Sequence, residues 1–264
     1  MIELTDIVVT FNRGTPLENV VLRGVNLNVP SGQFLTVIGS NGAGKSTALN
    51  VIAGIVTPSS GRVAIDRTDI TGAPTHKRAR QISRVFQDPR MGTCEGLTIL
   101  ENFALAFART RPRGLRFAID RDIRERAAER VKLLKLGLEN RLNDKVGLLS
   151  GGQRQAISLL MATSGSTRVL LLDEHTAALD PKTGGFVVEL TQSIVAELKL
   201  TTVMVTHSMA QALQVGDRTV MFHRGEIVFD VAGDERRAMS VSDLLALFKR
   251  DHGEELSDDA LLLG

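Results

Sequence analysis

The feature that most constrains the fold is a glycine-rich segment at residues 39–46, which reads Gly-Ser-Asn-Gly-Ala-Gly-Lys-Ser. It fits the spacing Gly-x4-Gly-Lys-Ser and lies between a short apolar strand predicted at 34–38 and a helix predicted at about 45–53. Glycines let backbone N–H groups converge on phosphate oxygens, and the start of the helix adds partial positive charge. The segment therefore predicts a phosphate-binding loop; the strand and helix on either side disfavour the alternative, an ordinary glycine-rich turn.

The alternation of strand and helix patterns along the chain predicts an α/β core. Strand-like apolar runs at 169–172, 202–205 and 218–222 are separated by helical patterns at 183–198 and 209–214. Such alternation is typical of a mostly parallel sheet with helices on both faces.

Two other regions depart from this alternation. Residues 2–10 and 19–29 alternate apolar and polar side chains, which is the pattern of half-buried strands. Residues 99–108 and 120–136 have helical spacing, and no strand pattern interrupts this part of the chain. We therefore expect a β-rich start to the chain and an all-helical insert at about 90–165.

The composition is that of an ordinary globular protein. Of 264 residues, 43% are hydrophobic and 23% are charged, which allows a substantial core and excludes a disordered or collagen-like chain. The formal net charge of +2 gives no indication of a nucleic-acid partner. The single cysteine, Cys94, cannot form an internal disulfide. Because no apolar run approaches the roughly 20 residues that span a bilayer, and the N-terminus resembles a strand more than a signal peptide, we expect a cytosolic chain.

A pair of carboxylates follows one of the predicted strands. The apolar run at 169–172 ends in Asp173 and Glu174, at the carboxyl edge of the predicted sheet, where ligands of such sheets bind. We expect Asp173 on the Mg²⁺ side of a bound nucleotide and Glu174 as the general base for the attacking water. In isolation the same pattern is equally that of a solvated strand end, and the phosphate loop earlier in the chain favours the functional interpretation.

A second glycine motif, Leu-Ser-Gly-Gly-Gln at 149–153, precedes a helical stretch at 154–163. A serine and two glycines at a helix start predict a second anion site, the alternative being a glycine-rich helix cap. Because one nucleotide does not need two phosphate cradles in one subunit, we expect each subunit to offer this cradle to its partner's ATP. With this motif the sequence resembles the ATP-binding subunits of ABC transporters, over about residues 2–245.

The resemblance implies roles for four further residues. Gln87 matches the Q-loop glutamine, which contacts Mg²⁺ and water, and Asp180 matches the D-loop, which crosses the dimer interface. His207 stands where the family's switch histidine contacts the γ-phosphate, and Phe11 stands where an aromatic ring stacks on adenine. Taken alone, a glutamine in a loop is ordinary surface and a histidine at a strand end is usually structural. Their order along the chain favours the family roles.

The expected site therefore holds ATP and Mg²⁺. The expected catalytic residues are Lys45, Gln87, Glu174 and His207, and the expected Mg²⁺ ligands are Ser46, Gln87 and Asp173. The residues expected to contact a nucleotide are Phe11, Gly39, Ser40, Asn41, Gly42, Ala43, Gly44, Lys45, Ser46, Thr47, Gln87, Ser150, Gly151, Gly152, Gln153 and Asp180.

Two residues depart from the family pattern. Phe11 stands where the family usually has Tyr; the chain has no Tyr or Trp, so the π-face is kept and the hydroxyl is lost. His175 follows Glu174 where the family usually has Pro. An imidazole beside Glu174 would make the protonation of that carboxylate pH-sensitive. We favour the alternative, an inert substitution.

The resemblance also implies the fold of an ABC ATPase cassette. This is an α/β P-loop NTPase core with a mostly parallel sheet, an N-terminal antiparallel β subdomain and an inserted all-helical subdomain. We expect a single cassette at 1–250, with its core at about 1–88 and 166–245 and its helical subdomain at about 90–165. The acidic stretch 251–264 is expected to be a flexible tail.

The expected function is that of the ATPase subunit of a transporter. The resemblance implies a subunit that binds MgATP, closes on a second copy of itself as a head-to-tail dimer, and drives a separate integral-membrane permease from the inner face of the cell membrane. A stand-alone cassette is the form common among prokaryotic importers, so uptake is the expected direction, with a solute-binding protein elsewhere in the system. The run at 173–180 resembles cassettes associated with uptake of amino-acid-like or other small organic solutes.

Two alternatives to transport remain at this point. One is a soluble ABC-type ATPase that does not transport, such as a cofactor-assembly scaffold, which is a single cassette of similar size. The other is a P-loop kinase or GTPase outside this family. The second alternative would explain residues 39–46 but not residues 149–153.

Overall fold

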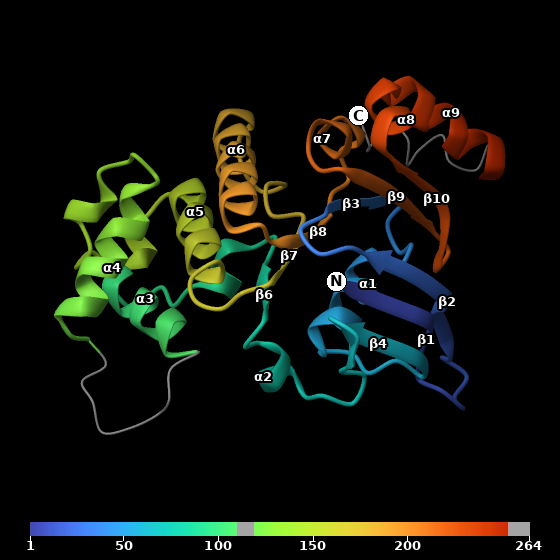
Figure 1. The fold of residues 1–264 in the computed structure, drawn as a ribbon, viewed down its shortest axis with the longest axis horizontal. Helices are drawn as coiled ribbons and strands as arrows, with labels where there is room; N and C mark the ends of the chain where they lie inside the picture. Colours follow the sequence, from blue (N-terminus) through green and yellow to red (C-terminus); the bar gives the residue numbers. More distant parts are fainter. Residues whose placement is uncertain (110–118, 253–264) are drawn as a thin grey trace. The chain divides into compact units, whose positions relative to one another are not determined.

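The computed structural model describes residues 1–109 and 119–252, and it divides into two compact units (Figure 1). The first unit joins Met1–Arg78 to the chain from Lys199 onward, and the second unit is Ala79–Leu198. Residues 253–264, most of the predicted acidic tail, lie outside the described residues, so the flexibility of that tail stays a prediction.

The first unit contains the antiparallel sheet with which the chain begins. Its strand order is β2-β1-β4-β5, with β1 at Ile2–Phe11, β2 at Asn19–Val29, β4 at Ser60–Ile65 and β5 at Thr68–Asp69. The strand β1 pairs with both neighbours, so that Ile2 lies opposite Val29 on one side and Ile65 on the other. Alternate apolar side chains of β1 and β2 are buried, which confirms the half-buried pattern expected from the sequence.

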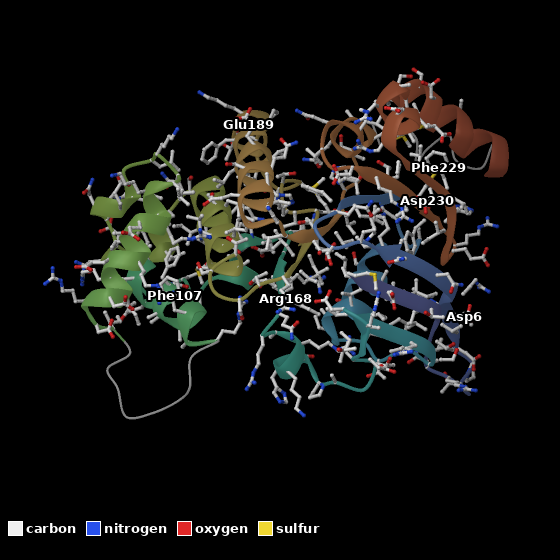
Figure 2. The ribbon with its side chains drawn as sticks, in the orientation of Figure 1. Asp6, Phe107, Arg168, Glu189, Phe229 and Asp230 are labelled. Atoms are coloured by element: carbon white, nitrogen blue, oxygen red, sulfur yellow. The ribbon has the colours of Figure 1, made fainter. Side chains whose placement is uncertain are left out.

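The other strands of the first unit carry the glycine-rich loop. They lie in the order β10-β9-β3-β8, with β3 at Phe34–Gly39, β8 at Thr201–Val205, β9 at Arg218–His223 and β10 at Glu226–Ala232. The strand β3 is buried along its whole length and pairs in parallel with β8 and β9, whereas β10 pairs antiparallel with β9. Arg218 of β9 donates from Nε to Oδ1 of Asp230 of β10 at 2.6 Å, and Asp230 is labelled in Figure 2. A fully buried central strand explains why residues 34–38 are apolar except for Thr36, whose buried hydroxyl lies 2.8 Å from Oγ1 of Thr219 in β9.

Two buried arginines bind the helix ends of the first unit. The helices here are α1 at Lys45–Ala53, α2 at Thr75–Arg78, α7 at Met209–Gln214, α8 at Gly233–Ala238 and α9 at Val241–His252. Arg78 donates to the carbonyl oxygen of Val51 in the last turn of α1 at 2.7 Å. Arg236 donates to the carbonyl oxygens of Ala212 in α7 at 2.6 Å and of Val215 just after it at 2.5 Å. Carbonyls at a helix end have no partner within the helix, and these guanidinium groups satisfy them.

In the second unit, the described residues form two parallel strands and four longer helices. The strands are β6 at Ile82–Val85 and β7 at Val169–Asp173, with Ile82 opposite Val169 and Val85 opposite Leu172. The helices are α3 at Ile99–Ala108, α4 at Arg121–Lys132, α5 at Gly151–Ala162 and α6 at Pro181–Leu198. Three short 3-10 helices connect them, η1 at Pro89–Gly92, η2 at Leu138–Asn140 and η3 at Val146–Leu148.

An aromatic pair lies between α3 and α4. The rings of Phe103 and Phe107 in α3 have their centroids 5.8 Å apart, and Phe107 is labelled in Figure 2. The guanidinium carbon of Arg126 in α4 lies 4.3 Å from the centroid of the Phe107 ring, which is a cation–π contact. Ile123 and Ala127 of α4 are buried one turn apart, so α4 presents an apolar stripe and keeps its charges on the other side.

The predicted elements are confirmed in most places, and the differences have local causes. The helix expected at 120–136 ends at Lys132, because Lys135 and Gly137 adopt positive φ angles of 54° and 71°. The helix expected from 183 begins at Pro181, since proline is tolerated in a first helical turn. The sequence pattern does not predict β10, which returns alongside β9 after a tight turn at Arg224–Gly225. Within the described ranges, no helix is both long and apolar enough to cross a membrane.

Candidate active site

The glycine-rich loop follows β3 and leads directly into α1. Gly39 has a φ of 142°, and a Cβ added there would lie 2.1 Å from the carbonyl oxygen of Phe222 in β9. Gly44, just before α1, has a φ of 101°, and its added Cβ would lie 2.7 Å from Leu22 Cδ2 and 3.1 Å from the carbonyl oxygen of Val21. Both positions therefore require glycine, because the conformation and the space exclude a side chain.

Lys45 folds back onto this loop. Its side chain is 6% exposed, and Nζ donates to the carbonyl oxygens of Gly39 at 2.6 Å and Ser40 at 2.9 Å. Ser46 is exposed in the first turn of α1, and Thr47 beside it is half-buried. A buried ammonium group inside a glycine loop at a helix N-terminus fits a phosphate chemically, since both the charge and the helix start attract an anion.

His207 lies at the same edge of the first unit's strands as this loop. The parallel pairing of β3 and β8 runs to Val37 opposite Val205, and the N–H of Thr206 donates to the carbonyl oxygen of Val37 at 3.1 Å. Continuing that register by two residues puts His207 level with Gly39. His207 is half-buried and stands immediately before Ser208, which caps α7.

Phe11 is the last residue of the strand β1. It pairs with Asn19 of β2, and the next residue, Asn12, adopts a φ of 53° that ends the strand. Phe11 is 40% exposed, which is unusual for a phenylalanine and leaves part of its ring open for stacking. Phe11, the loop at 39–47 and His207 thus all belong to the first unit.

The carboxylates predicted from the sequence belong to the second unit. Asp173 is the last residue of β7, and its Oδ2 accepts a hydrogen bond from Nη2 of Arg84 in β6 at 2.5 Å. Glu174 follows with a φ of 45°, a left-handed conformation that is uncommon outside glycine. Such backbone strain gathers at functional sites, where the surrounding structure holds it in place.

His175 anchors this strained residue to α6. It is 1% exposed, and its Nε2 lies 3.1 Å from Oγ1 of Thr191, whose hydroxyl donates to the carbonyl oxygen of Val187 at 2.7 Å. Because the Thr191 hydrogen is already used, Nε2 of His175 is the donor in this pair. Burial lowers the pKa of His175 from 6.5 to about 4, so the ring is neutral near pH 7. The structure therefore favours the inert substitution over the pH-sensitive imidazole.

The Leu-Ser-Gly-Gly-Gln segment starts α5 with a capping box. Oγ of Ser150 accepts from the N–H of Gln153 at 3.3 Å, and Oε1 of Gln153 accepts from the N–H of Ser150 at 3.1 Å. Ser150 and Gly151 are exposed, and the Ser150 hydroxyl keeps its hydrogen for another acceptor. Gly152 is buried, and a Cβ there would lie 1.9 Å from Cγ2 of Thr183 at the start of α6. The segment is thus a helix cap and at the same time an exposed set of donors.

Asp180 caps the helix α6 next to that segment. Its Oδ1 accepts from the N–H of Thr183 at 3.1 Å. The hydrogen bonds from Thr183, side chain first and then backbone, hold the pKa of the exposed Asp180 carboxyl below its usual range. A Cβ on Gly151 would lie 3.7 Å from Cδ2 of Leu179, the residue before Asp180. The second unit therefore brings the residues at 150–153 beside Asp180.

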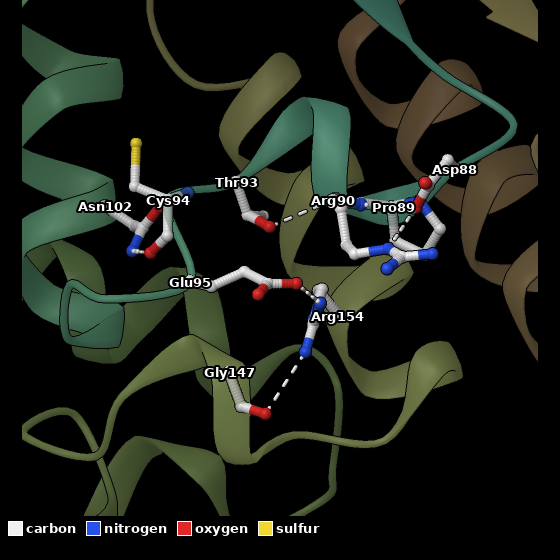
Figure 3. A network of polar contacts seen from close by, with 9 residues as sticks. All are labelled: Asp88, Pro89, Arg90, Thr93, Cys94, Glu95, Asn102, Gly147 and Arg154. Carbon is white, nitrogen blue, oxygen red and sulfur yellow. Dashed lines mark hydrogen bonds and ion pairs between the residues drawn. The ribbon is translucent and has the colours of Figure 1, made fainter.

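Gln87 is exposed just after β6, and a polar network holds the segment that follows it (Figure 3). The carboxylate of Asp88 accepts from the N–H of Arg90 at 2.9 Å, and Arg154 in the first turn of α5 pairs with Glu95. Arg154 also donates to the carbonyl oxygen of Gly147 at 3.2 Å, as Figure 3 shows. The chain after Gln87 is thus tied to the start of α5.

Two residues of this region carry no signal that sequence reasoning could use. Gln155 is fully buried in α5, and its Nε2 donates to the carbonyl oxygens of Phe86 at 2.9 Å and His175 at 2.7 Å. Arg84 reaches Asp173 across 89 positions of sequence. Both look ordinary in the sequence, because a polar residue in a helix or strand gains its meaning from a partner far along the chain.

The candidate residues form two groups, one in each unit. Phe11, the loop at 39–47 and His207 form the first, and the second is Gln87, Ser150, Gly151, Gly152, Gln153, Asp173, Glu174 and Asp180. Among the described residues, no cluster of three or more His, Cys, Asp or Glu side chains is arranged to hold a metal ion. The expected Mg²⁺ ligands are one carboxylate and neutral oxygens, which are the donor types that Mg²⁺ accepts alongside phosphates.

Comparison with known proteins identifies the family. The model of the ABC transporter family matches residues 22–177. A tyrosine transport ATP-binding protein of Clostridioides difficile is 45% identical over 88% of this chain and 92% of its own length. An aliphatic sulfonates import ATP-binding protein of Rhizobium johnstonii is 37% identical over 81% of this chain and 72% of its own.

Solved structures agree with this match. A dimeric ATP-binding cassette in a post-hydrolysis state, bound to ADP and Pi, is similar with a TM-score of 0.76 and 31% identity, covering 88% of this chain and 98% of that chain. The chain belongs to the ABC transporter family and has the fold of its ATPase cassette. It is accordingly an ATP-binding subunit that hydrolyses ATP to energise transport.

Proposed function

We propose that this chain powers the uptake of an amino acid, with an aromatic amino acid as the first candidate, through a separate integral-membrane permease. The 45% identity to a tyrosine transport ATP-binding protein supports the solute class, whereas the sulfonate, methionine and polyamine import relatives are 32–37% identical. The cassette itself does not touch the solute. The proposal therefore places the chain on the inner face of the cell membrane, with a permease and a solute-binding protein as further components.

The proposed catalytic unit is a head-to-tail dimer with two ATP molecules between the subunits. One observation carries this proposal: both α1, with buried Lys45, and α5, with exposed Ser150, begin at glycine-rich segments. Each is suited to an anion, and one nucleotide needs a single cradle from each subunit. The similarity to a cassette solved as a dimer with ADP and Pi supports the same arrangement.

The proposed roles divide between the two groups of residues. Residues 39–47 bind the phosphates, Lys45 neutralises charge that develops on them, and the ring of Phe11 stacks on adenine. Ser150, Gly151, Gly152 and Gln153 bind the partner's nucleotide, and Asp180 contributes at the dimer interface. Glu174 accepts a proton from the attacking water, and His207 donates to the γ-phosphate.

We also propose Mg²⁺ as the metal, with Ser46, Gln87 and Asp173 on its side of the nucleotide. Hydroxyl, amide and carboxylate oxygens are hard donors, and Mg²⁺ prefers them to nitrogen or sulfur. When bound, the ion would neutralise charge on the phosphate oxygens. In the same proposal residues 1–250 act as one cassette, with the core at about 1–88 and 166–245 and a helical subdomain at about 90–165.

The mechanism is tested by Glu174→Gln, which removes the base and keeps the shape. We expect phosphate release to fall by about 10²-fold or more and the chain to accumulate as an ATP-bound dimer with MgATP. The matched control is Glu189→Gln at an exposed position of α6, which should turn over ATP like the parent chain. Light scattering measures whether the dimer accumulates, and phosphate release measures the rate of ATP hydrolysis. A Glu174→Gln chain that stays monomeric and fully active would refute the mechanism.

The partner is tested by purification from native membranes in mild detergent. We expect the tagged chain to bring down an integral membrane protein in stoichiometric amount, and radiolabelled tyrosine uptake to depend on both. If the chain is absent from the membrane fraction and copurifies only with a soluble partner, the result would favour a soluble ABC-type ATPase such as a cofactor-assembly scaffold.

A further inference from the structure

Arg84 is a charged residue in the strand β6, beside the carboxylate predicted to face Mg²⁺. It lies opposite Leu171 of β7, and its Nη2 donates to Oδ2 of Asp173 at 2.5 Å. The side chains of Arg84 and Asp173 are only 12% and 15% exposed. The pair is thus largely withdrawn from water. A buried carboxylate without a compensating charge is energetically costly, so Arg84 stabilises Asp173 there.

A second contact holds the guanidinium group in place. Its central carbon lies 4.8 Å from the centroid of the Phe86 ring. Phe86 directly follows β6 and is two residues from Arg84, which is the spacing that puts side chains on the same side of an extended chain. This cation–π contact does not involve Asp173, and it can persist when the carboxylate takes another partner.

We propose that Arg84 is the resident counter-ion of Asp173 and competes with Mg²⁺ for it. The inference rests on the proposed function, in which Asp173 faces the metal. Without metal-bound nucleotide, Arg84 neutralises the carboxylate and stabilises the end of β7. When MgATP binds, the guanidinium releases Asp173 and stays against Phe86.

The competition follows from charge. A cation beside a carboxylate attracts it and repels a second cation, so a site that already holds a guanidinium group binds Mg²⁺ less tightly. Arg84 therefore raises the Mg²⁺ concentration that the nucleotide site needs. It also keeps Asp173 in position between turnovers, which makes Arg84 a positioning residue.

The test is a Mg²⁺ titration of purified full-length chain with a fluorescent non-hydrolysable ATP analogue, mant-AMPPNP. The chain has no Trp or Tyr, so its own emission does not interfere. In Arg84→Met we expect half-maximal binding at an about five-fold lower Mg²⁺ concentration, equivalent to about 1 kcal/mol. The control Arg62→Met removes the same charge from an exposed pair with Asp69 at 3.0 Å and should not shift the titration.

Thermal unfolding supplies a readout that does not depend on the nucleotide site being active. Without nucleotide, Arg84→Met should unfold at a lower temperature than the parent chain, and MgAMPPNP should narrow that gap. Adding Asp173→Asn to Arg84→Met should recover much of the lost stability, because no buried charge then lacks a partner. Arg84→Lys keeps the charge, so its Mg²⁺ requirement should stay within about two-fold of the parent.

Several outcomes would overturn the proposal. An unchanged or raised Mg²⁺ requirement in Arg84→Met would make Arg84 a structural residue, and weaker analogue binding without Mg²⁺ would make it a phosphate ligand. If Arg84→Met does not fold, a shifted requirement in Arg84→Lys contradicts the proposal in the same way. Failure of the proposed function looks different, because the parent chain itself would then bind the analogue without any dependence on Mg²⁺.

Discussion

The first unit shapes its candidate residues mainly through backbone, and the second unit holds them mainly through side chains. In the first, the added Cβ of Gly39 would lie 2.1 Å from a carbonyl oxygen of β9, and Lys45 is held by two carbonyl oxygens of its own loop. In the second, Asp173 is held by Arg84 and His175 by Thr191.

This difference predicts different responses to substitution. A position closed by backbone has no neighbour that can be exchanged, so a substitution there cannot be repaired by a second one. A position closed by a side chain can be repaired by changing that side chain. Substitutions in the two units therefore test the comparison directly.

Gly39→Ala should have the largest effect. The new methyl group would overlap the carbonyl oxygen of Phe222 at a φ of 142°, and we expect a loss of more than about 4 kcal/mol in the free energy of unfolding. Urea denaturation measures it. The control Gly185→Ala, at an exposed helical position with nothing within 4 Å, should be neutral or stabilising by about 0.5 kcal/mol. Equal effects of the two substitutions would contradict the backbone argument.

Gly152→Ala should cost less and be repairable. Its methyl group would meet Cγ2 of Thr183 at 1.9 Å, and we expect a loss of about 2 kcal/mol from overpacking. Adding Thr183→Ser removes that methyl group and should restore more than half of the stability. Chemical denaturation measures the free energy of unfolding of the single and double variants. If Thr183→Ser does not restore stability, the surroundings of Gly152 are as rigid as those of Gly39 in the glycine-rich loop.

The pH dependence of stability should carry the signature of His175. Its folded pKa is lowered by burial to about 4 from 6.5, so the unfolded chain takes up a proton at higher pH than the folded one. Stability is therefore complete above about pH 6.5 and falls with pH until about 4, by about 2 kcal/mol between pH 7 and pH 5. Urea denaturation at both pH values should show a flatter dependence for His175→Gln. If the free energy of unfolding depends on pH equally in the parent chain and in His175→Gln, the loss of stability at low pH does not come from His175.

The pair of Glu95 and Arg154 should contribute least. The Glu95 side chain is 49% exposed, so solvent screens the interaction, and we expect a coupling energy below about 1 kcal/mol. A double-mutant cycle with Glu95→Gln and Arg154→Gln isolates it from the bond that Arg154 makes to Gly147. A coupling of about 3 kcal/mol would mean that this pair, rather than the packing of α5, holds the segment after Gln87.

The part of the candidate site that depends on local backbone was predictable from the sequence. The residues at 39–46, the strand before them and the helix after them are neighbours in the chain, so the local sequence pattern predicts their conformation. The same holds for Ser150 and Gln153, whose spacing is that of a capping box. The fold class followed from the alternation of strands and helices for the same reason.

The rest depends on contacts between residues distant in sequence. Gly152 is required because Thr183 lies against it, and nothing near residue 152 indicates this. The neutral state of His175 follows from its burial under α6, whereas the sequence shows only an imidazole beside a carboxylate. Arg84 and Gln155 escaped prediction entirely, because Asp173 is 89 positions from Arg84, and Phe86 and His175 are 69 and 20 positions from Gln155.

Gln155 has a consequence for how the second unit moves. Its side-chain amide donates to the carbonyl oxygens of Phe86, just after β6, and of His175, just after β7. One side chain therefore links α5 to both strand ends. Moving α5 away breaks both of these bonds, and moving either strand end breaks its bond to α5 as well as its pairing with the other strand. The three segments should therefore open to solvent together, and in hydrogen–deuterium exchange their slow amides should share one rate instead of fraying separately.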